Sequence, residues 1–66
     1  MELIINGERK EFATQITLEE LLEILHLKEK VMAAAVNMQI VKQNEWATHL
    51  LCQNDKVELL DFVGGG

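Results

Sequence analysis

The fold of this chain is decided by the stretch Thr17-Leu18-Glu19-Glu20-Leu21-Leu22-Glu23-Ile24-Leu25. Thr17 is a favourable N-cap residue, and Glu20 three positions later completes a capping box, because each side chain can bond the backbone N–H of the other residue. Leucines then recur with the three- and four-residue spacing of one helix face. The stretch therefore predicts one amphipathic helix, fading near residues 26–28, whose leucine stripe belongs to the core.

A β-hairpin is predicted before this helix. Residues 1–5 are apolar and mostly β-branched or leucine apart from one glutamate, which is typical of a strand. Asn6-Gly7 follows, and this pair favours a type I′ turn, in which both central positions need positive φ. Residues 8–13 would then return as a second strand, and the consecutive charges at its start suit an exposed sheet edge.

Three more strands are predicted after the helix. Residues 31–36 form a continuous apolar run and read as a buried strand. Asn37 tolerates a left-handed turn, and a short partner strand begins at Ile40-Val41. The polar residues 42–49 predict a turn or a short helix, and residues 53–55 predict the turn that precedes the last strand.

The last strand, residues 56–63, alternates between two kinds of surface. Val57 and Leu59 point to one face of the sheet, because side chains alternate along a strand. If that face meets the helix, Leu60 and Phe62 lie together on the other face. An exposed apolar pair is unusual unless a partner docks on it, so we predict a docking patch of Leu60 and Phe62.

The predicted order is two strands, one helix and three strands. One helix covers one face of a sheet, so we expect an α+β roll in which a mixed sheet packs on the helix and its other face stays open. We assign residues 1–63 to this domain and residues 64–66 to a separate glycine tail.

Composition narrows the classes of partner. The chain has 66 residues and a net charge of −5, which argues against nucleic acid and anionic membranes and favours a partner with a basic surface. No apolar run approaches the ~20 residues of a membrane span, and no signal peptide is apparent, so we expect a cytoplasmic protein.

Few side chains suggest chemistry of their own. Cys52 has no second cysteine to pair with, and because it follows Leu50-Leu51 we expect a buried structural thiol rather than a nucleophile. His26 and His49 lack metal-ligand spacing and are expected at the surface or at the boundary of the core, and Trp46 is expected as a satellite of the core. We therefore predict no metal site and no catalytic residue, so the chain is not expected to be an enzyme.

The three terminal glycines are the remaining candidate. They present no side chain, and their one reactive group is the α-carboxylate of Gly66. A carboxylate is a poor electrophile, but an acyl adenylate has a good leaving group, and a sulfur nucleophile could convert it to a thiocarboxylate. A glycine-rich end is also typical of linkers. The position of the glycines directly after a strand favours the chemical interpretation.

At this point the sequence resembles a known family, the thiamine-pathway sulfur carrier proteins, which have the ubiquitin-like β-grasp fold. The resemblance covers the whole chain. It rests on Ile4-Ile5-Asn6-Gly7, residues 17–22, Ala35-Val36-Asn37, Ile40-Val41, Trp46, Asp55 and the terminal glycines. The family ends in Gly-Gly, whereas this chain ends in Gly-Gly-Gly.

The resemblance implies a cycle driven by partner proteins. An adenylyltransferase of the ubiquitin-activating type would use ATP and magnesium to adenylate Gly66, while Gly64 and Gly65 thread into the partner. Sulfur would come from a cysteine desulfurase or another persulfide donor, and a thiazole synthase would receive it. The chain itself would bind no cofactor. Two alternatives are a carrier like the small subunit of molybdopterin synthase, and a ubiquitin-like binding module with an inert tail.

Overall fold

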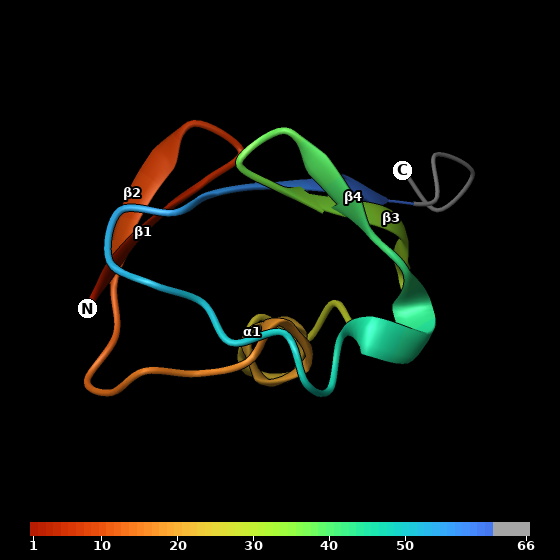
Figure 1. Cartoon of the computed structure of the whole chain (residues 1–66), viewed down its shortest axis with the longest axis horizontal. Helices are drawn as coiled ribbons and strands as arrows, with labels where there is room; N and C mark the ends of the chain where they lie inside the picture. Colours follow the sequence, from red (N-terminus) through yellow and green to blue (C-terminus); the bar gives the residue numbers. More distant parts are fainter. Residues whose placement is uncertain (62–66) are drawn as a thin grey trace.

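A computed structural model describes residues 1–61 and shows one sheet packed on one helix (Figure 1). The elements are β1 (Glu2–Ile5), β2 (Glu8–Glu11), α1 (Leu18–Ile24), β3 (Val31–Val36), β4 (Gln39–Val41), a 3-10 turn (Gln43–Glu45) and β5 (Lys56–Asp61). The strand order is β2-β1-β5-β3-β4, with β1 and β5 parallel and the other pairs antiparallel. The predicted α+β architecture, a mixed sheet on one helix, is confirmed. No helix within residues 1–61 is long and apolar enough to cross a membrane.

Both hairpin turns use left-handed backbone. Asn6 and Gly7 have φ of 49° and 86°, which confirms the turn that Asn-Gly predicts. The β3–β4 hairpin uses Asn37 and Met38, at 51° and 71°. The sequence predicted the left-handed residue at Asn37 but not the one at Met38, because a methionine is rarely found there.

The helix begins as its capping box predicts. The Thr17 side chain accepts a hydrogen bond from the Glu20 N–H at 3.1 Å, and Glu20 Oε1 accepts one from the Thr17 N–H at 2.8 Å. The next residues that face the sheet are fully buried: Leu18, Leu21 and Leu22. Leu25 is only partly buried, because the helix ends before it and His26 adopts a φ of 60°.

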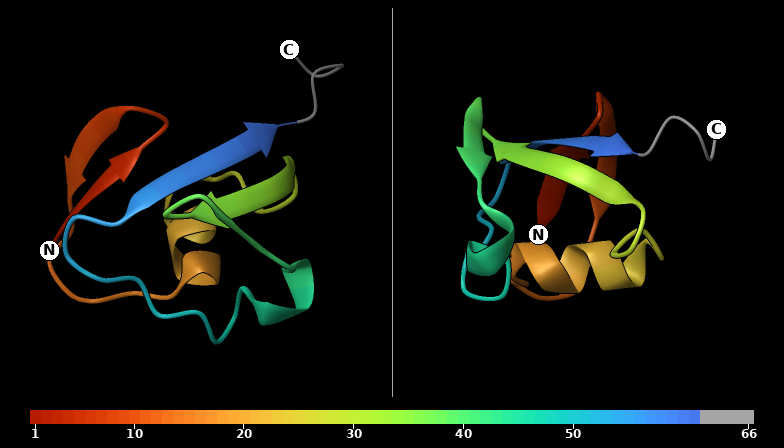
Figure 2. Two further views of the ribbon diagram at one scale, coloured as in Figure 1. Left: turned by 45° about the horizontal axis from the view of Figure 1, so that its top comes forward. Right: turned by 90° about the vertical axis from the view of Figure 1, so that its right-hand side faces the viewer.

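The core lies between α1 and one face of the sheet (Figure 2). Strands contribute alternate residues to it, among them Leu3, Ile5, Ala34, Val36, Val57 and Leu59. Trp46 belongs to the core itself rather than to a satellite, since it is 2% exposed and its indole N–H donates to the Val41 carbonyl at 2.9 Å. The 3-10 turn that precedes Trp46 is therefore fastened to β4.

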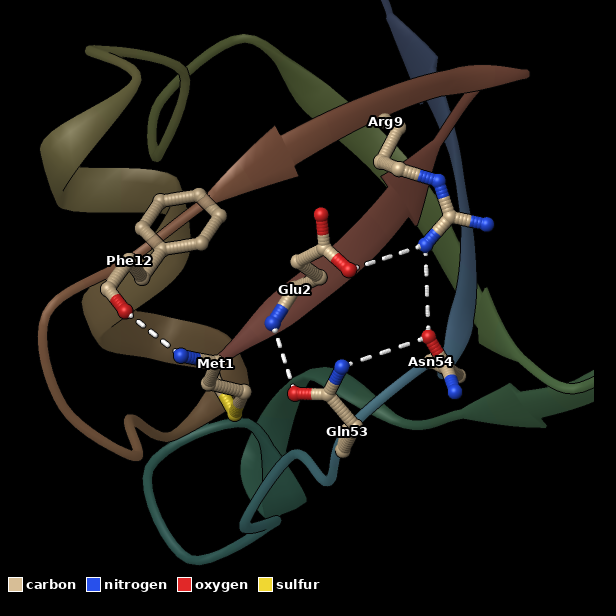
Figure 3. Close-up of polar contacts among 6 residues, drawn as sticks. All are labelled: Met1, Glu2, Arg9, Phe12, Gln53 and Asn54. Atoms are coloured by element: carbon tan, nitrogen blue, oxygen red, sulfur yellow. Dashed lines mark hydrogen bonds and ion pairs between the residues drawn. The ribbon is translucent and has the colours of Figure 1, made fainter.

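Polar contacts fasten the start of β5 to the first hairpin (Figure 3). Arg9 Nη1 lies 3.3 Å from both Glu2 Oε1 and Asn54 Oδ1, and the Asn54 N–H donates to the Glu2 carbonyl at 2.8 Å. The Met1 ammonium donates to the Phe12 carbonyl at 2.8 Å, at the far end of β2. Exposed ion pairs contribute little, so the turn is tied to β1 chiefly by the hydrogen bonds of the backbone, from the Asn54 N–H to the Glu2 carbonyl and from the Ile4 N–H to the Asp55 carbonyl.

We predict that Thr17→Ala lowers the free energy of unfolding by about 1 kcal/mol, because the Glu20 N–H loses its acceptor. For a domain of this size, the midpoint of thermal unfolding should fall by about 4–8 °C. Thr48→Ala is the matched control, since Thr48 is exposed and its hydroxyl makes only a 3.4 Å contact with the Glu45 carbonyl. Equal midpoints for the two variants would contradict the capping role.

Candidate functional site

The candidate site is built on β5, the central strand of the sheet. One edge of β5 pairs with β1, through Ile4–Lys56 and Ile5–Val57. Its other edge pairs with β3 as far as Val31–Asp61. Asp61 is the last residue of β5 that the structure describes, and Phe62 and Val63 separate it from the three glycines in the sequence.

The two faces of β5 differ as the sequence predicts. Val57 and Leu59 are buried against the helix side, at 0% and 8% exposure. Leu60 is 55% exposed, on the open face of the sheet. The predicted partner of Leu60 in a docking patch, Phe62, lies outside the described residues, as do Val63 and the glycines 64–66. The roles assigned to these residues, and the boundary between domain and tail, stay predictions.

Leu60 borders an open hollow in this face. The hollow measures about 380 Å³ and includes Ala33 and Ala35 of β3, with Ile40 of β4 and Asn6 among its other lining residues. Ile40 is 72% exposed. The register sets Ala33 opposite Leu60 and Ala35 opposite Ile40, so small side chains separate two exposed apolar ones. This hollow can receive an apolar side chain of a partner protein.

Sequence reasoning missed Ile40 and the alanines as part of this surface. The available signal was the run Ala33-Ala34-Ala35, whose small side chains leave space on whichever face is uncovered. The alanine run by itself does not show which face of the sheet is open, or that β3 lies between β5 and β4.

Among the described residues, the charged one that lines the hollow is Glu58, beside Leu60. Alternation along β5 places Lys56 on the same face and Asp61 on the other. On the opposite side of the sheet, the pKa of Lys28 is raised, chiefly by its hydrogen bond and charge interaction with Glu19 and then by Glu23. Both carboxylates lie 3.4 Å from the Lys28 ammonium. The groups around the hollow suit a docking partner that is apolar at its centre and basic at its rim.

The prediction that Cys52 is buried is wrong. The Cys52 side chain is exposed, because the segment from Leu50 to Cys52 is extended and its side chains alternate. Leu50 is 51% exposed, Leu51 is fully buried, and Cys52 points outward again. A polar contact of 3.9 Å joins Gln15 Nε2 to its sulfur. The two adjacent leucines suggested a buried run, whereas only the second belongs to the core.

The histidines lie where the sequence placed them. His26 is exposed and His49 is half-buried. Across the described part of the chain, no three His, Cys, Asp or Glu side chains are grouped so that they could hold a metal ion. The candidate functional features are the open face of the sheet and strand β5.

Comparison with known proteins decides the family. The model of the ThiS family matches residues 3–66. The chain belongs to the ThiS family. The curated relative of the same name, the sulfur carrier protein ThiS of Escherichia coli, is 33% identical over 66 residues and is covered over its full length, as is this chain. The resemblance drawn from the sequence is thus confirmed, and the family is one of sulfur carriers in thiamine biosynthesis.

Two further similarities extend this result. The crystal structure of the ThiS thiamine biosynthesis protein of Geobacter metallireducens superposes with a TM-score of 0.83 at 27% identity, and the match covers both chains completely. This confirms the ThiS β-grasp fold. A thiazole synthase of Paramagnetospirillum magneticum is 36% identical over all 66 residues, and the chain spans 20% of the length of that protein.

The exposed position of Cys52 leads to a prediction. The native Cys52 thiol should react with a disulfide reagent about as fast as the thiol of the urea-unfolded chain, because no burial protects it. Cys52→Ser should change the free energy of unfolding by less than about 0.5 kcal/mol, as surface substitutions usually do.

The same serine variant should accept sulfur as the unchanged chain does, because a terminal thiocarboxylate needs no internal thiol. Slow reaction of the native thiol would contradict the exposed placement. If the serine variant folds but no longer accepts sulfur, Cys52 rather than the terminal carboxylate carries the sulfur.

Proposed function

We propose that this chain is a protein sulfur carrier whose working group is the α-carboxylate of Gly66. The observation that carries this proposal is the central position of β5, the last strand that the structure describes, which is followed in the sequence by Phe62, Val63 and the three terminal glycines. The family supports the carrier role. The glycines offer one reactive group and no side chain to block its entry into a narrow channel.

The proposed chemistry proceeds in two steps on partner enzymes. An adenylyltransferase of the ubiquitin-activating type joins the Gly66 carboxylate to the α-phosphate of ATP, with magnesium present, and pyrophosphate leaves. In the second step, the outer sulfur of the persulfide of a cysteine desulfurase, or of a similar donor, attacks the acyl carbon and displaces AMP to give an acyl disulfide. A thiol reductant then cleaves the S–S bond, which leaves the thiocarboxylate and releases the donor sulfur in a disulfide with that thiol. Gly64 and Gly65 thread into the partner's active site. The chain supplies the substrate for each step and the partners supply the catalysis.

We assign the docking of partner proteins to the open face of the sheet, opposite α1. Leu60 and Ile40 stand on either side of the alanine-floored hollow, and the sequence predicts that Phe62 joins Leu60. A few apolar or aromatic anchors supply most of the affinity of an interface. The net charge of −5 favours association with a basic partner surface. The patch is close along the chain to the glycines, so docking there would bring the tail to the active site.

The proposed acceptor of the sulfur is a thiazole synthase. Support comes from the thiazole synthase of Paramagnetospirillum magneticum, in which one fifth of the chain is similar to this protein. A carrier-like segment within a thiazole synthase is expected if the two work together. The similarity to the E. coli sulfur carrier ThiS, over the full length of both chains, favours this acceptor over molybdopterin synthase.

We predict that deleting Gly65-Gly66 abolishes adenylation and leaves the midpoint of thermal unfolding unchanged within about 1 °C, because two glycines have no side chains to contribute to a core. Pyrophosphate release measured with the adenylyltransferase and ATP tests the first part. A chain with one alanine added after Gly66 is the matched control for tail length, and it should also be inactive in thiazole formation. Activity in the shortened chain would contradict the proposal, and so would a large loss of stability.

The two faces of β5 predict opposite effects for two neighbouring substitutions. Leu60→Asp should weaken binding to the adenylyltransferase by roughly tenfold or more, since a 1.4 kcal/mol loss at one anchor gives a factor of ten. It should leave the domain folded, because Leu60 is 55% exposed. Leu59→Asp should unfold the domain, because it buries a carboxylate without a partner.

Binding and urea unfolding are measured side by side on these two variants. Phe62→Asp should behave like Leu60→Asp. If Leu60→Asp binds as well as the unchanged chain, the open face is not the docking surface.

A further inference from the structure

Asn6 makes a pair of side-chain hydrogen bonds to the last strand. Its Oδ1 accepts from the Leu59 N–H at 2.8 Å, and its Nδ2 donates to the Leu59 carbonyl at 3.3 Å. Both backbone groups of one β5 residue are therefore bonded to a single side chain. Asn6 itself lies at the end of β1, where the chain turns away toward β2.

These bonds continue the parallel pairing of β1 and β5 by one step. The Ile4 N–H donates to the Asp55 carbonyl at 3.0 Å, and the Asn6 N–H donates to the Val57 carbonyl at 2.9 Å. In a regular parallel ladder, the next bonds would run from the Leu59 N–H to the Asn6 backbone carbonyl and from the N–H of Glu8 to the Leu59 carbonyl. The chain turns at Asn6-Gly7 instead. The carboxamide of Asn6 takes the place of these backbone groups, because it offers one carbonyl acceptor and N–H donors like a peptide group.

The turn alone does not explain asparagine at this position. Its φ of 49° would suit glycine better, and aspartate also tolerates this region. Glycine would have no group for Leu59, and an ionised aspartate could accept from its N–H but could not donate to its carbonyl. Asparagine supplies the left-handed backbone and both hydrogen bonds together.

We propose that Asn6 is a positioning residue that sets the direction in which β5 delivers the C-terminal glycines to a partner. This inference rests on the proposed sulfur-carrier function. On the β3 side, pairing holds β5 as far as Asp61. On the β1 side, the backbone pairing reaches Val57, and Asn6 extends the hold to Leu59. Without the side chain of Asn6, the part of β5 beyond Val57 is held only by its pairing with β3.

Loss of the hydrogen bonds between Asn6 and Leu59 should weaken partner binding. A strand end that is already fixed need not be ordered when the complex forms, and that ordering otherwise weakens affinity. Once bound, the partner itself orients the tail. Loss of Asn6 should therefore raise the KM for the carrier in adenylation and leave kcat nearly unchanged.

The chain provides a matched control in Asn37. It also has positive φ, at 51°, and its Oδ1 accepts from the Lys56 N–H at 3.0 Å. Its Nδ2 donates to Asp55 Oδ1 at 2.9 Å. Asn37 thus holds the same strand from the other hairpin, at the end where β5 begins. A variant there disturbs the fold similarly but leaves the exit of the strand in place.

The experiment compares Asn6→Gly with Asn37→Gly in the full chain, at a temperature where both are folded. The readouts are KM and kcat for adenylation and amide hydrogen exchange along β5. We expect Asn6→Gly to raise KM about fivefold, as the loss of a net hydrogen bond would, and to speed exchange at Leu59. Asn37→Gly should leave KM unchanged and speed exchange at Lys56.

Equal KM increases in the two variants, or an unchanged KM in Asn6→Gly, would overturn the positioning role while the carrier function stands. A lower kcat at constant KM would overturn it too. Should Asn6→Gly be too unstable, Asn6→Asp keeps the acceptor for the Leu59 N–H and should show a smaller rise in KM. If the unchanged chain is not adenylated at all, the proposed function fails and the positioning role fails with it.

Discussion

The pairing of β5 along both of its edges is the interaction on which the rest of the structure depends. β5 joins the two hairpins into one sheet, because β1 pairs with one of its edges and β3 with the other. Val57 and Leu59 are buried core residues of this strand, which lies between the two hairpins. The strand that unites the fold is also the last described strand before the glycines in the sequence. Under the proposed carrier function, the hydrogen bonds that stabilise the domain also hold the strand that presents the tail.

A second constraint is that residues 1–61 contain a single α-helix. Seven helical residues cover one face of five strands, and the other face stays open. Alanines on β3 leave a hollow there between Ile40 and Leu60. A core of this size stabilises a small domain only marginally, and an exposed apolar pair adds nothing to that core. For this reason we propose the open face as the docking surface.

The features that were predictable from the sequence are those set by near neighbours. The Thr17–Glu20 capping box, the Asn6-Gly7 turn and the alternation of Val57 and Leu59 depend on residues a few positions apart. The exposed thiol of Cys52 and the hollow depend on which distant segments lie side by side. The bonds from Asn6 to Leu59 join residues 53 positions apart, and nothing near position 6 signals them.

The proposal that sulfur is carried on the terminal carboxylate is tested most directly by the intact mass of the chain after incubation with its adenylyltransferase, ATP and a sulfur source, followed by digestion to locate the change. If the carboxylate carries the sulfur, the C-terminal peptide becomes heavier by the difference between one sulfur and one oxygen atom. A gain of a whole sulfur atom on the peptide that holds Cys52, with an unchanged C-terminal peptide, would contradict it.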